Sequence, residues 1–564
     1  MHSEKLAHLI TSAMERRPTL ALKNARIVNV FSQEVIQGDI AICDDTLIGI
    51  GSYHAPREID LKGAYVCPGF IDAHVHIEST MAHPARFAQA VLPHGTTTVV
   101  ADPHELANVC GIPGIQYLLE QTEGLPLQVY MMAPSCVPCT GFESSGATLL
   151  AKDLKSLLSH PRVLGLGEVM DYTAVSQAEP NMLDKLSLFA GRPIDGHAPL
   201  VSGDALNAYC IAGPMTDHEC SNYEEILEKL RCGLRIQLRM GSAAHGIESI
   251  FRRIAWEELP TDRMMFCTDD KHLEDTRRDG HINYILRRAV AAGIGPIQAI
   301  RMATLNPAQA YGLRDRGAIA PGCRADLVVL PNLREFKPEM VFVAGQPYED
   351  CSLSIEKVTG NMASSVRLAP RTPGCLDLQA KGLMPVIELV PAQLVTKLAY
   401  REVPVDAQGN FQPGWGLNKL AVLERHHATG RIGLGILSGL GIQQGAIAST
   451  VAHDSHNLVV AGDNDRDIRL AIDALEGCGG GYVVVNQGQV KALLPLPIGG
   501  LMTELPLDAL LAAQQSLLQA AAELEVSHGS DPFITLSFLA LPVIPYVRLT
   551  DLGVFDVLQQ RFIR

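Results

Sequence analysis

Two histidines separated by one residue form the pattern in this chain that most clearly indicates chemistry. His74 and His76 flank Val75 within the apolar stretch PGFIDAHVHIEST, residues 68–80. On a β-strand alternate side chains point to the same face, so both imidazoles would face one side. Two such nitrogens can bind one metal ion at distances of about 2.0–2.1 Å. The stretch therefore predicts a metal site at the end of a strand.

Further ionisable residues stand where later apolar, strand-like runs end. Glu168 ends RVLGLGE, His197 ends RPIDGH, and Asp269 ends RMMFCTD. In parallel α/β structures the carboxyl ends of the strands carry the functional residues. We therefore look for functional residues at the ends of these runs.

The segment that must position these residues alternates between strand-like and helical stretches. From residue 68 to residue 315, apolar runs such as TTTVVAD, LQVYMMAP and LRIQLRM are separated by helical stretches. This alternation predicts βα units around a parallel sheet, and the length is that of a (β/α)8 barrel. The alternative is an open doubly wound sheet, but the segment contains no glycine-rich phosphate loop to support it.

The regions on either side of this segment have a different pattern. Residues 1–18 predict an amphipathic helix, and short β-rich runs on both sides of the barrel segment predict one small β-domain built from two pieces. The last 200 or so residues hold mixed α/β elements of a further domain. We expect the chain to divide at these boundaries: 1–67 (helix and first β piece), 68–315 (barrel), 316–357 (second β piece) and 358–564 (C-terminal α/β domain).

Composition limits the classes of protein to which the chain can belong. A length of 564 residues with 47% hydrophobic and 19% charged residues indicates a globular protein of several domains. The net charge of −15 argues against nonspecific binding to nucleic acid or to an anionic membrane. The N-terminal stretch lacks the apolar region of a signal peptide, and the run from Phe533 to Pro545 is too short to span a bilayer. We expect a cytoplasmic protein, and a homo-oligomer remains open.

The thirteen cysteines are scattered along the chain. Only Cys136 and Cys139 form a CxxC pair, and no second pair completes a four-thiolate zinc site. We expect reduced thiols. The H-x-E and P-C-x-x-C pattern of zinc deaminases that act on nucleic acids is also missing.

The order of the site residues resembles the amidohydrolase superfamily. Members carry HxH on the first barrel strand, a bridging carboxylate on the fourth, histidines on the fifth and sixth, and an aspartate on the eighth. A glutamate at position 168, in place of a carboxylated lysine, is similar to the bacterial adenine deaminases. That resemblance extends over nearly the whole chain, through PGFIDAHVHIEST, GTTTVVADPHE, GEVMDY, DGHAP, CTDD, TVAHDSHN, LPLPIGGLM and LPVIP.

This resemblance implies hydrolytic deamination of adenine to hypoxanthine and ammonia by two divalent ions. Imidazole and carboxylate ligands suit Mn²⁺ or Fe²⁺, which the resemblance favours, and also Zn²⁺. Such ions lower the pKa of bound water to about 7. Asp269 would transfer the proton, and Asp270 competes with it for this role because the two are adjacent. The implied ligands are His74, His76, Glu168, His197, His218 and Asp269, with Glu168 and Asp269 as the catalytic pair.

A second group of residues could contact substrate. His104 and Glu105 in DPHE follow the second barrel strand, so they should face the same mouth or, alternatively, cap a helix. The histidines of VAHDSHN either reach over the barrel from the C-terminal domain or form a surface turn. We expect His272 and His281 to be solvated loop residues. The candidates for substrate contact are His104, Glu105, Arg239, Asp270, His453, Asp454 and His456.

One departure leaves the substrate open. After the seventh strand the family usually has Arg-Glu-Gly-Ser, whereas this chain has Met240 after Arg239. A glutamate could hydrogen-bond purine nitrogens and a methionine cannot, so a more apolar pocket for an N6-substituted adenine or another aminoheterocycle is an alternative. Hydrolysis of a cyclic amide with the same metals, and a barrel that serves only as a non-catalytic scaffold, are further alternatives.

Overall fold

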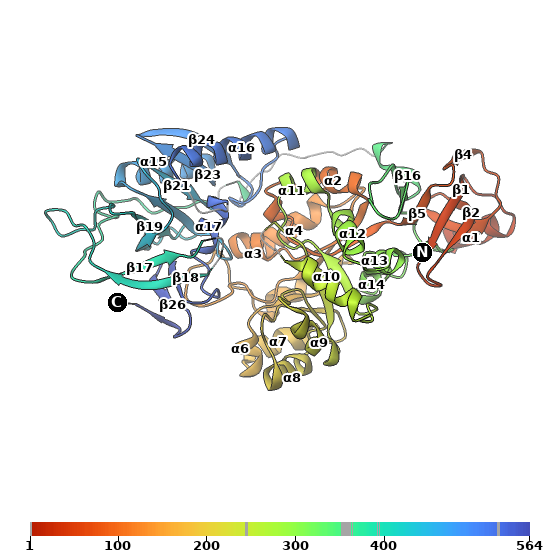
Figure 1. Ribbon diagram of the computed structural model, residues 1–564, viewed down its shortest axis with the longest axis horizontal. Coiled ribbons are helices and arrows are strands. Elements are labelled where there is room, and N and C mark those ends of the chain that lie inside the picture. Colours follow the sequence, from red (N-terminus) through yellow and green to blue (C-terminus); the bar gives the residue numbers. More distant parts are fainter. Residues whose placement is uncertain are drawn as a thin grey trace.

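The computed structural model describes residues 3–242, 246–350, 362–363, 365–391, 393, 395–526 and 531–563. Three units follow one another along the long axis of the molecule (Figure 1). The small β-domain with the N-terminus lies at one end, the βα segment in the middle, and the C-terminal domain at the other end. The boundary predicted at residues 357 and 358 lies outside the described residues.

Strands from both sides of the central segment share one sheet. Helix α1 (Ser3–Met14) is shorter than the predicted helix and packs Leu9 against this sheet. β14 pairs antiparallel with β5, so Leu327 lies opposite Pro68. The sheet order is β16-β15-β14-β5-β1-β2-β3, with β4 on β1. Its strands are β1 (Leu20–Asn29), β2 (Glu34–Cys43), β3 (Thr46–Gly51), β4 (Arg57–Asp60), β5 (Tyr65–Pro68), β14 (Leu327–Leu330), β15 (Met340–Val343) and β16 (Gln346–Pro347).

The central segment contains parallel strands that neighbour one another in chain order. A five-stranded sheet runs from β6 to β10 and a three-stranded sheet from β11 to β13. The strands are β6 (Phe70–Val75), β7 (Thr96–Ala101), β8 (Gln128–Ala133), β9 (Val163–Val169), β10 (Ile194–Gly196), β11 (Thr216–Asp217), β12 (Arg235–Arg239) and β13 (Met264–Cys267). The α-helices are α2 (Pro84–Val91), α3 (His104–Cys110), α4 (Ile112–Gln121), α5 (Ala151–Leu154), α6 (Tyr172–Ser176), α7 (Pro180–Leu188), α8 (Gly203–Ala212), α9 (Tyr223–Arg231), α10 (Ile247–Trp256), α11 (Leu273–Asp279), α12 (Ile282–Ala291), α13 (Pro296–Met302) and α14 (Leu305–Ala310).

Backbone hydrogen bonds join these two sheets at both edges. The N–H of Met215, just before β11, donates to the carbonyl of Ile194 in β10 at 2.8 Å. At the other edge the N–H of Asp269, after β13, donates to the carbonyl of His74 in β6 at 3.0 Å. Val75 and Asp269 also form a parallel bridge. The arrangement is TIM-barrel-like, and it brings the carboxyl ends of the strands to one rim.

The C-terminal domain is built on one mostly antiparallel sheet. The strand order is β18-β17-β20-β19-β22-β21-β23-β24. Helix α15 (Asp465–Cys478) begins after the cap Asn464 and packs Ile468, Ile472 and Leu475 on this sheet. The other elements are β17 (Met384–Leu389), β18 (Thr396–Arg401), β19 (Leu417–Leu423), β20 (Ile432–Ser438), β21 (Gly445–Ser449), β22 (Leu458–Gly462), β23 (Gly481–Asn486), β24 (Gln489–Pro495), α16 (Leu507–Glu523), α17 (Pro532–Phe538), β25 (Val547–Thr550), β26 (Gly553–Asp556) and β27 (Arg561–Phe562).

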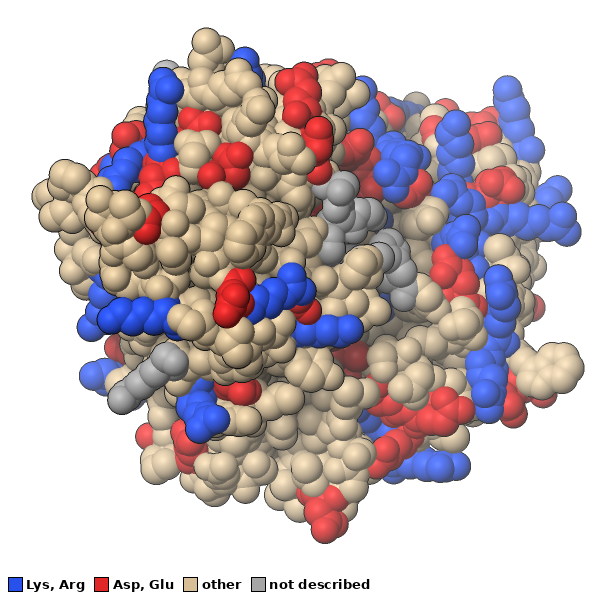
Figure 2. All heavy atoms as spheres, turned by 60° about the vertical axis from the view of Figure 1, so that its left-hand side comes forward, with Lys and Arg blue, Asp and Glu red and all other residues tan. Residues whose placement is uncertain are grey.

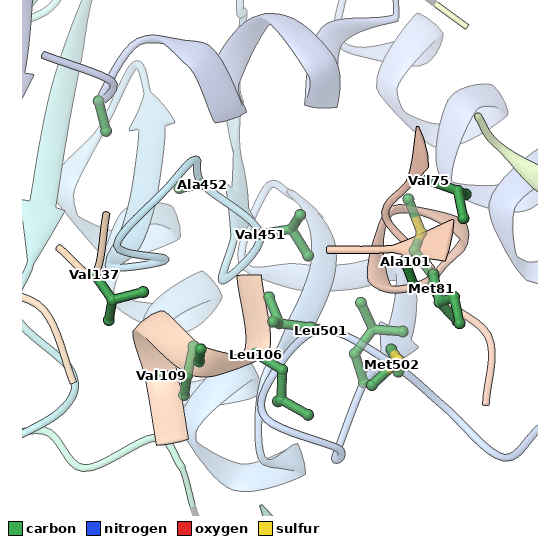
Figure 3. Close-up of a cluster of buried hydrophobic side chains, with 14 of the residues drawn as sticks. Val75, Met81, Ala101, Leu106, Val109, Val137, Val451, Ala452, Leu501 and Met502 are labelled. Carbon is green, nitrogen blue, oxygen red and sulfur yellow. The ribbon is translucent and has the colours of Figure 1, made fainter. Parts of the chain in front are cut away.

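An apolar core connects the central unit to the C-terminal domain. Leu106 and Val109 of α3 lie beside Leu501 and Val451 of the C-terminal domain (Figure 3). The backbone N–H of Thr503 donates to the carbonyl of Met81 at 2.9 Å, across the same interface. Because buried apolar contact is what fixes one unit on another, the C-terminal domain is held in place over this part of the rim.

Charged side chains of both signs lie on the surface. Acidic and basic side chains are interspersed on the face that Figure 2 draws. Within the described residues no helix combines the length and the apolar character needed to span a membrane. The cysteines that the structure describes are all free.

Candidate metal centre

Four ligand atoms converge at the end of β6. His74 and His76 are buried, and their Nε2 atoms are 3.2 Å apart. Each Nε2 lies between 3.0 and 3.3 Å from both Glu168 Oε1 and Asp269 Oδ1. Two imidazole nitrogens and two carboxylate oxygens therefore surround one point.

The hydrogen bonds around this group leave its ligand atoms facing inward. His76 Nδ1 lies 2.9 Å from the carbonyl of Asp102 and donates to it, so the lone pair of the neutral ring is on Nε2. Glu168 Oε1 is buried and accepts no hydrogen bond from the residues that the structure describes. Buried lone pairs directed at one another are unfavourable unless a cation lies among them.

Glu168 extends the arrangement to a second group of ligands. Its other oxygen, Oε2, lies 2.9 Å from His197 Nδ1 and 3.4 Å from His218 Nε2. Those two histidine nitrogens are 3.3 Å apart. One carboxylate thus offers one oxygen to each of two histidine pairs, and this donor set fits two divalent cations bridged by Glu168.

The fold holds Glu168 through a close backbone approach at β9. The N–H of Glu168 donates to Asp102 Oδ2 at 2.9 Å, and Ser135 Oγ donates to its carbonyl. A Cβ at Gly167 would stand 2.0 Å from Asp102 Oδ2. Glycine is therefore required before the bridging residue, because any side chain would displace the aspartate that orients it.

Two adjacent aspartates, Asp269 and Asp270, face different neighbours. Asp269 has a left-handed backbone (φ 57°) and directs Oδ1 at the first histidine pair. Arg239 Nη1 lies 2.6 Å from its Oδ2. Burial opposes ionisation of Asp269, but Arg239 and the histidines hold its pKa well below the usual range. Asp270 instead accepts a hydrogen bond from Ser79 Oγ. The geometry therefore favours Asp269 over Asp270 as the ligand.

Sequence reasoning missed one acidic residue of the site. Glu219 Oε1 lies 2.6 Å from Arg239 Nη1 and 3.6 Å from His218 Nε2. Arg239 thus connects Glu219 to Asp269 across the rim. The signal was available in the sequence, since Glu219 directly follows His218 in MTDHE.

Two further expectations need correction. Met240 packs in the apolar core with Leu238 and Ile247, so its side chain is not part of the cavity beside Asp270 described next. His281 was expected in solvent, but it is only 1% exposed, and its Nδ1 lies 2.9 Å from Thr96 Oγ1. In both cases a loop or strand end turns inward, and the sequence pattern does not encode that turn.

A cavity opens beside Asp270, between the central unit and the C-terminal domain. Including the part open to solvent it measures about 460 Å³. His272 is one of its lining residues. The walls are formed by Ser79, Met81, Ser242, Asp270, His272, Val451, His453, Tyr482, Ile534, Ser537 and Phe538.

A group of buried side chains leads from the metal centre to the C-terminal domain. His104 Nδ1 lies 3.6 Å from Glu168 Oε1, and His104 Nε2 lies 3.5 Å from Glu105 Oε1. His453 Nδ1 lies 2.7 Å from Glu105 Oε1, and His456 Nε2 contacts Glu105 Oε2. Asp454 is buried behind the cavity wall, with Oδ1 4.0 Å from His453 Nδ1. VAHDSHN is therefore no surface turn.

Comparisons with known proteins agree with this geometry. Residues 65–262 and 252–348 match the model of the amidohydrolase family, and residues 393–561 match the adenine deaminase C-terminal domain. Adenine deaminase 2 of Carboxydothermus hydrogenoformans is 46% identical over 559 residues, which cover 97% of each chain. Adenine deaminase of Desulfitobacterium hafniense is 42% identical over 567 residues, which cover 100% of each chain. The chain belongs to the adenine deaminase family.

A solved structure described as an adenine deaminase is 16% identical with a TM-score of 0.46, and the match covers 59% of this chain and 99% of that one. The two family models divide the site of this adenine deaminase family member between them. His74, Glu168 and Asp270 fall in the amidohydrolase matches, and His453 and His456 fall in the C-terminal match. Both parts contribute to the cavity.

Proposed function

We propose that the protein is a metal-dependent adenine deaminase that hydrolyses adenine to hypoxanthine and ammonia. In this reaction the bond between C6 and the exocyclic nitrogen breaks, and water supplies the oxygen that replaces the nitrogen. The observation that carries the proposal is the position of Glu168 between two histidine pairs, in a chain that matches adenine deaminases over nearly its full length.

The donor atoms support two divalent ions at the ends of the strands. When bound, such ions lower the pKa of water to about 7 and make it nucleophilic at neutral pH. Mn²⁺ or Fe²⁺ suits imidazole and carboxylate ligands, and Zn²⁺ is a further option. The proposed ligands are His74, His76, Glu168, His197, His218 and Asp269.

Asp269 is the proposed proton carrier. Its carboxylate is ionised, because Arg239 and the two histidines oppose the effect of burial on its pKa. It can therefore accept a proton from the attacking water and return it to a ring nitrogen or to the departing amine. Arg239, 2.6 Å from Oδ2, limits rotation of this carboxylate, and Glu219 orients Arg239.

The cavity beside Asp270 is the proposed substrate site. Asp270 lines this cavity and directly follows the proposed ligand Asp269 in the chain. A heterocycle bound there would therefore lie near the ligand cluster. Apolar walls from Met81, Val451 and Phe538 suit a flat aromatic ring, and Asp270 can accept a hydrogen bond from a purine N–H.

The architecture that supports this site is, in our proposal, a complete (β/α)8 barrel over residues 68–315. The hydrogen bonds from β10 to β11 and from β6 to β13 support closure. Residues 1–67 and 316–357 would form the small β-domain, and residues 358–564 the C-terminal α/β domain, which covers the substrate site.

A second candidate is deamination of an N6-substituted adenine. The cavity shares Met81 and Tyr482 with a neighbouring hollow whose far wall contains Leu517 and Leu518. A small substituent on the exocyclic nitrogen could occupy that apolar space. This neighbouring apolar space favours a broader range of substrates, and the hydrolytic deamination itself would be the same.

The test is hydrolysis by the purified protein after it is loaded with Mn²⁺ or Fe²⁺, measured as hypoxanthine formed from either purine and as ring opening of a cyclic amide. Adenine releases ammonia in this reaction, whereas N6-methyladenine releases methylamine. Adenine, N6-methyladenine and a cyclic amide would be compared at equal concentration, with metal content measured per chain. Turnover of adenine supports the first candidate, and preference for N6-methyladenine supports the second. Turnover of the cyclic amide alone would contradict both.

A further inference from the structure

One histidine of the C-terminal domain stands in the wall of the cavity. The ring of His453 stacks on Phe538 of α17, with centroids 4.8 Å apart and planes at 19°. Its side chain is 12% exposed and contributes to the cavity surface. On the edge away from the cavity, Nδ1 lies 2.7 Å from Glu105 Oε1. The opposite edge, with Nε2, is therefore the part of the ring available to a ligand.

The neighbouring histidine fixes Glu105 and excludes a metal ion at this position. His456 Nδ1 accepts the backbone N–H of Ala452 at 3.1 Å, so the proton of the neutral ring must be on Nε2. Burial lowers the pKa of His456, which keeps that ring neutral. Its Nε2–H then donates to Glu105 Oε2. Glu105, His453 and His456 are close enough to resemble a metal site, but His456 has no lone pair left to offer on that side.

Glu105 in turn determines the protonation of His453. Burial opposes ionisation of Glu105, but His453 and His456 hold its pKa well below its usual range, so it is an anion. For His453, burial opposes the charged form, yet the Glu105 carboxylate raises its pKa to about 9. At neutral pH the ring is an imidazolium, and Nε2 carries a proton. Among the described residues no hydrogen bond satisfies that Nε2–H.

We propose that His453 is a specificity-determining residue that donates a hydrogen bond from Nε2 to an acceptor nitrogen of the substrate heterocycle. Glu105, held by His456, positions it. Asp270, on another part of the cavity wall, accepts a hydrogen bond from a ring N–H or from the exocyclic amine. This inference rests on the proposed function, because it assigns the substrate of that reaction to this cavity.

The chemistry of the wall selects one class of ligand. An aminopurine presents acceptor nitrogens and N–H donors around one flat ring system. The cavity offers a cationic donor at His453 and an anionic acceptor at Asp270, on walls that are otherwise largely apolar. A hydrogen bond between a charged donor and a ring nitrogen is stronger than a neutral one, so loss of either partner should be measurable in binding.

The experiment compares wild type with His453→Phe, which keeps the aromatic stack but removes both ring nitrogens. Binding to the Mn²⁺-loaded protein is measured by calorimetry for purine and for its 1-deaza, 3-deaza and 7-deaza analogues, which have no amino group to lose. We expect wild type to bind purine about 10- to 100-fold more tightly than the variant. One deaza analogue, which lacks the contacted nitrogen, should bind both proteins equally.

Two further variants guard against a loss of folding. His453→Gln retains an amide N–H near the Nε2 position and should recover part of the affinity. His54→Phe changes an exposed histidine of the small β-domain outside the cavity and should bind purine like wild type. Circular dichroism and the metal content per chain should match wild type in all three.

The outcomes separate this inference from the proposed function. If wild type releases ammonia from adenine but His453→Phe weakens all four ligands equally, or none, the role of His453 is wrong and the deaminase proposal stands. If wild type releases no ammonia from adenine, yet one deaza analogue abolishes the difference between wild type and variant, the deaminase proposal fails and the role of His453 is supported.

Discussion

At the scale of single residues, Glu168 is the side chain on which the two ligand groups depend. One of its oxygens faces His74 and His76, and the other faces His197 and His218. An amide cannot replace it, because glutamine has only one oxygen and would direct its NH₂ group at a histidine pair.

We therefore predict that Glu168→Gln lowers the bound metal below two ions per chain. It should also reduce kcat by more than the 10- to 100-fold that is typical of losing a partner one step removed from a metal. Metal analysis and ammonia release would measure both effects. Glu120→Gln, at an exposed position on α4, is the matched control and should retain metal and activity. Full metal content in Glu168→Gln would contradict the bridging role.

The pH dependence of substrate affinity tests another single residue, His453. Its pKa is raised to about 9, so the imidazolium predominates below that pH and is lost as the pH rises through it. The Glu105, Asp454 and Asp270 carboxylates act on this ring, together with neutral His456. We expect the ratio of wild-type to His453→Gln affinity for purine to be constant near neutrality and to fall above about pH 9. A ratio that rises with pH would contradict a cationic donor.

At the scale of elements, α9 is fixed to β11 by one buried cation. Lys229 Nζ lies 2.7 Å from Asp217 Oδ2 and 2.7 Å from Glu225 Oε1, and its side chain is fully buried. Asp217 directly precedes His218, and its Oδ1 accepts the N–H of Ala198 at 2.8 Å. The ion pair between Lys229 and Asp217 therefore positions the two-residue strand that directly precedes the proposed ligand His218.

We predict that Lys229→Met destabilises the protein by about 3–5 kcal/mol, because Asp217 would remain buried without its partner. Urea unfolding monitored by circular dichroism would measure the change. Lys152→Met, at an exposed position on α5, should change the free energy of unfolding by less than about 0.5 kcal/mol. If both substitutions cost the same, the buried pair does not stabilise this element.

The lengths of the strands explain which parts of the site the sequence could predict. Strand ends at Glu168, His197 and Asp269 were predictable, because each terminates an apolar run of visible length. β11 has only two residues, too few for periodicity, and its ligand was found through family resemblance alone. The bond between Glu105 and His453 joins residues 348 positions apart, and no local pattern encodes such a contact. Asp269 and Asp270 have the same side chain and are adjacent, so the sequence alone does not distinguish them. In the structure Asp269 has a left-handed backbone.

At the scale of the whole molecule, the site requires two units that are distant in the chain. The strand ends supply the proposed ligands, and the C-terminal domain supplies His453 and the far wall of the cavity. The apolar core around Leu106 and Leu501 holds the two units together (Figure 3). A change at the metal centre should therefore affect the stability of the whole molecule as well as the reaction.

Removal of metal tests this coupling. The ligand side chains come from strands that unfolding separates, so metal should bind the folded chain and stabilise it by RT ln(1 + [M]/Kd) per ion. At a free Mn²⁺ concentration 100 times Kd the gain is about 2.7 kcal/mol for each ion. We expect chelation to lower the thermal midpoint in differential scanning calorimetry, and added Mn²⁺ to restore it in a concentration-dependent way. Glu168→Gln should respond much less to Mn²⁺ than wild type, because its two ligand groups no longer share a carboxylate. Equal midpoints for chelated and Mn²⁺-loaded wild type would show that the cluster around Glu168 binds no ion in the folded protein.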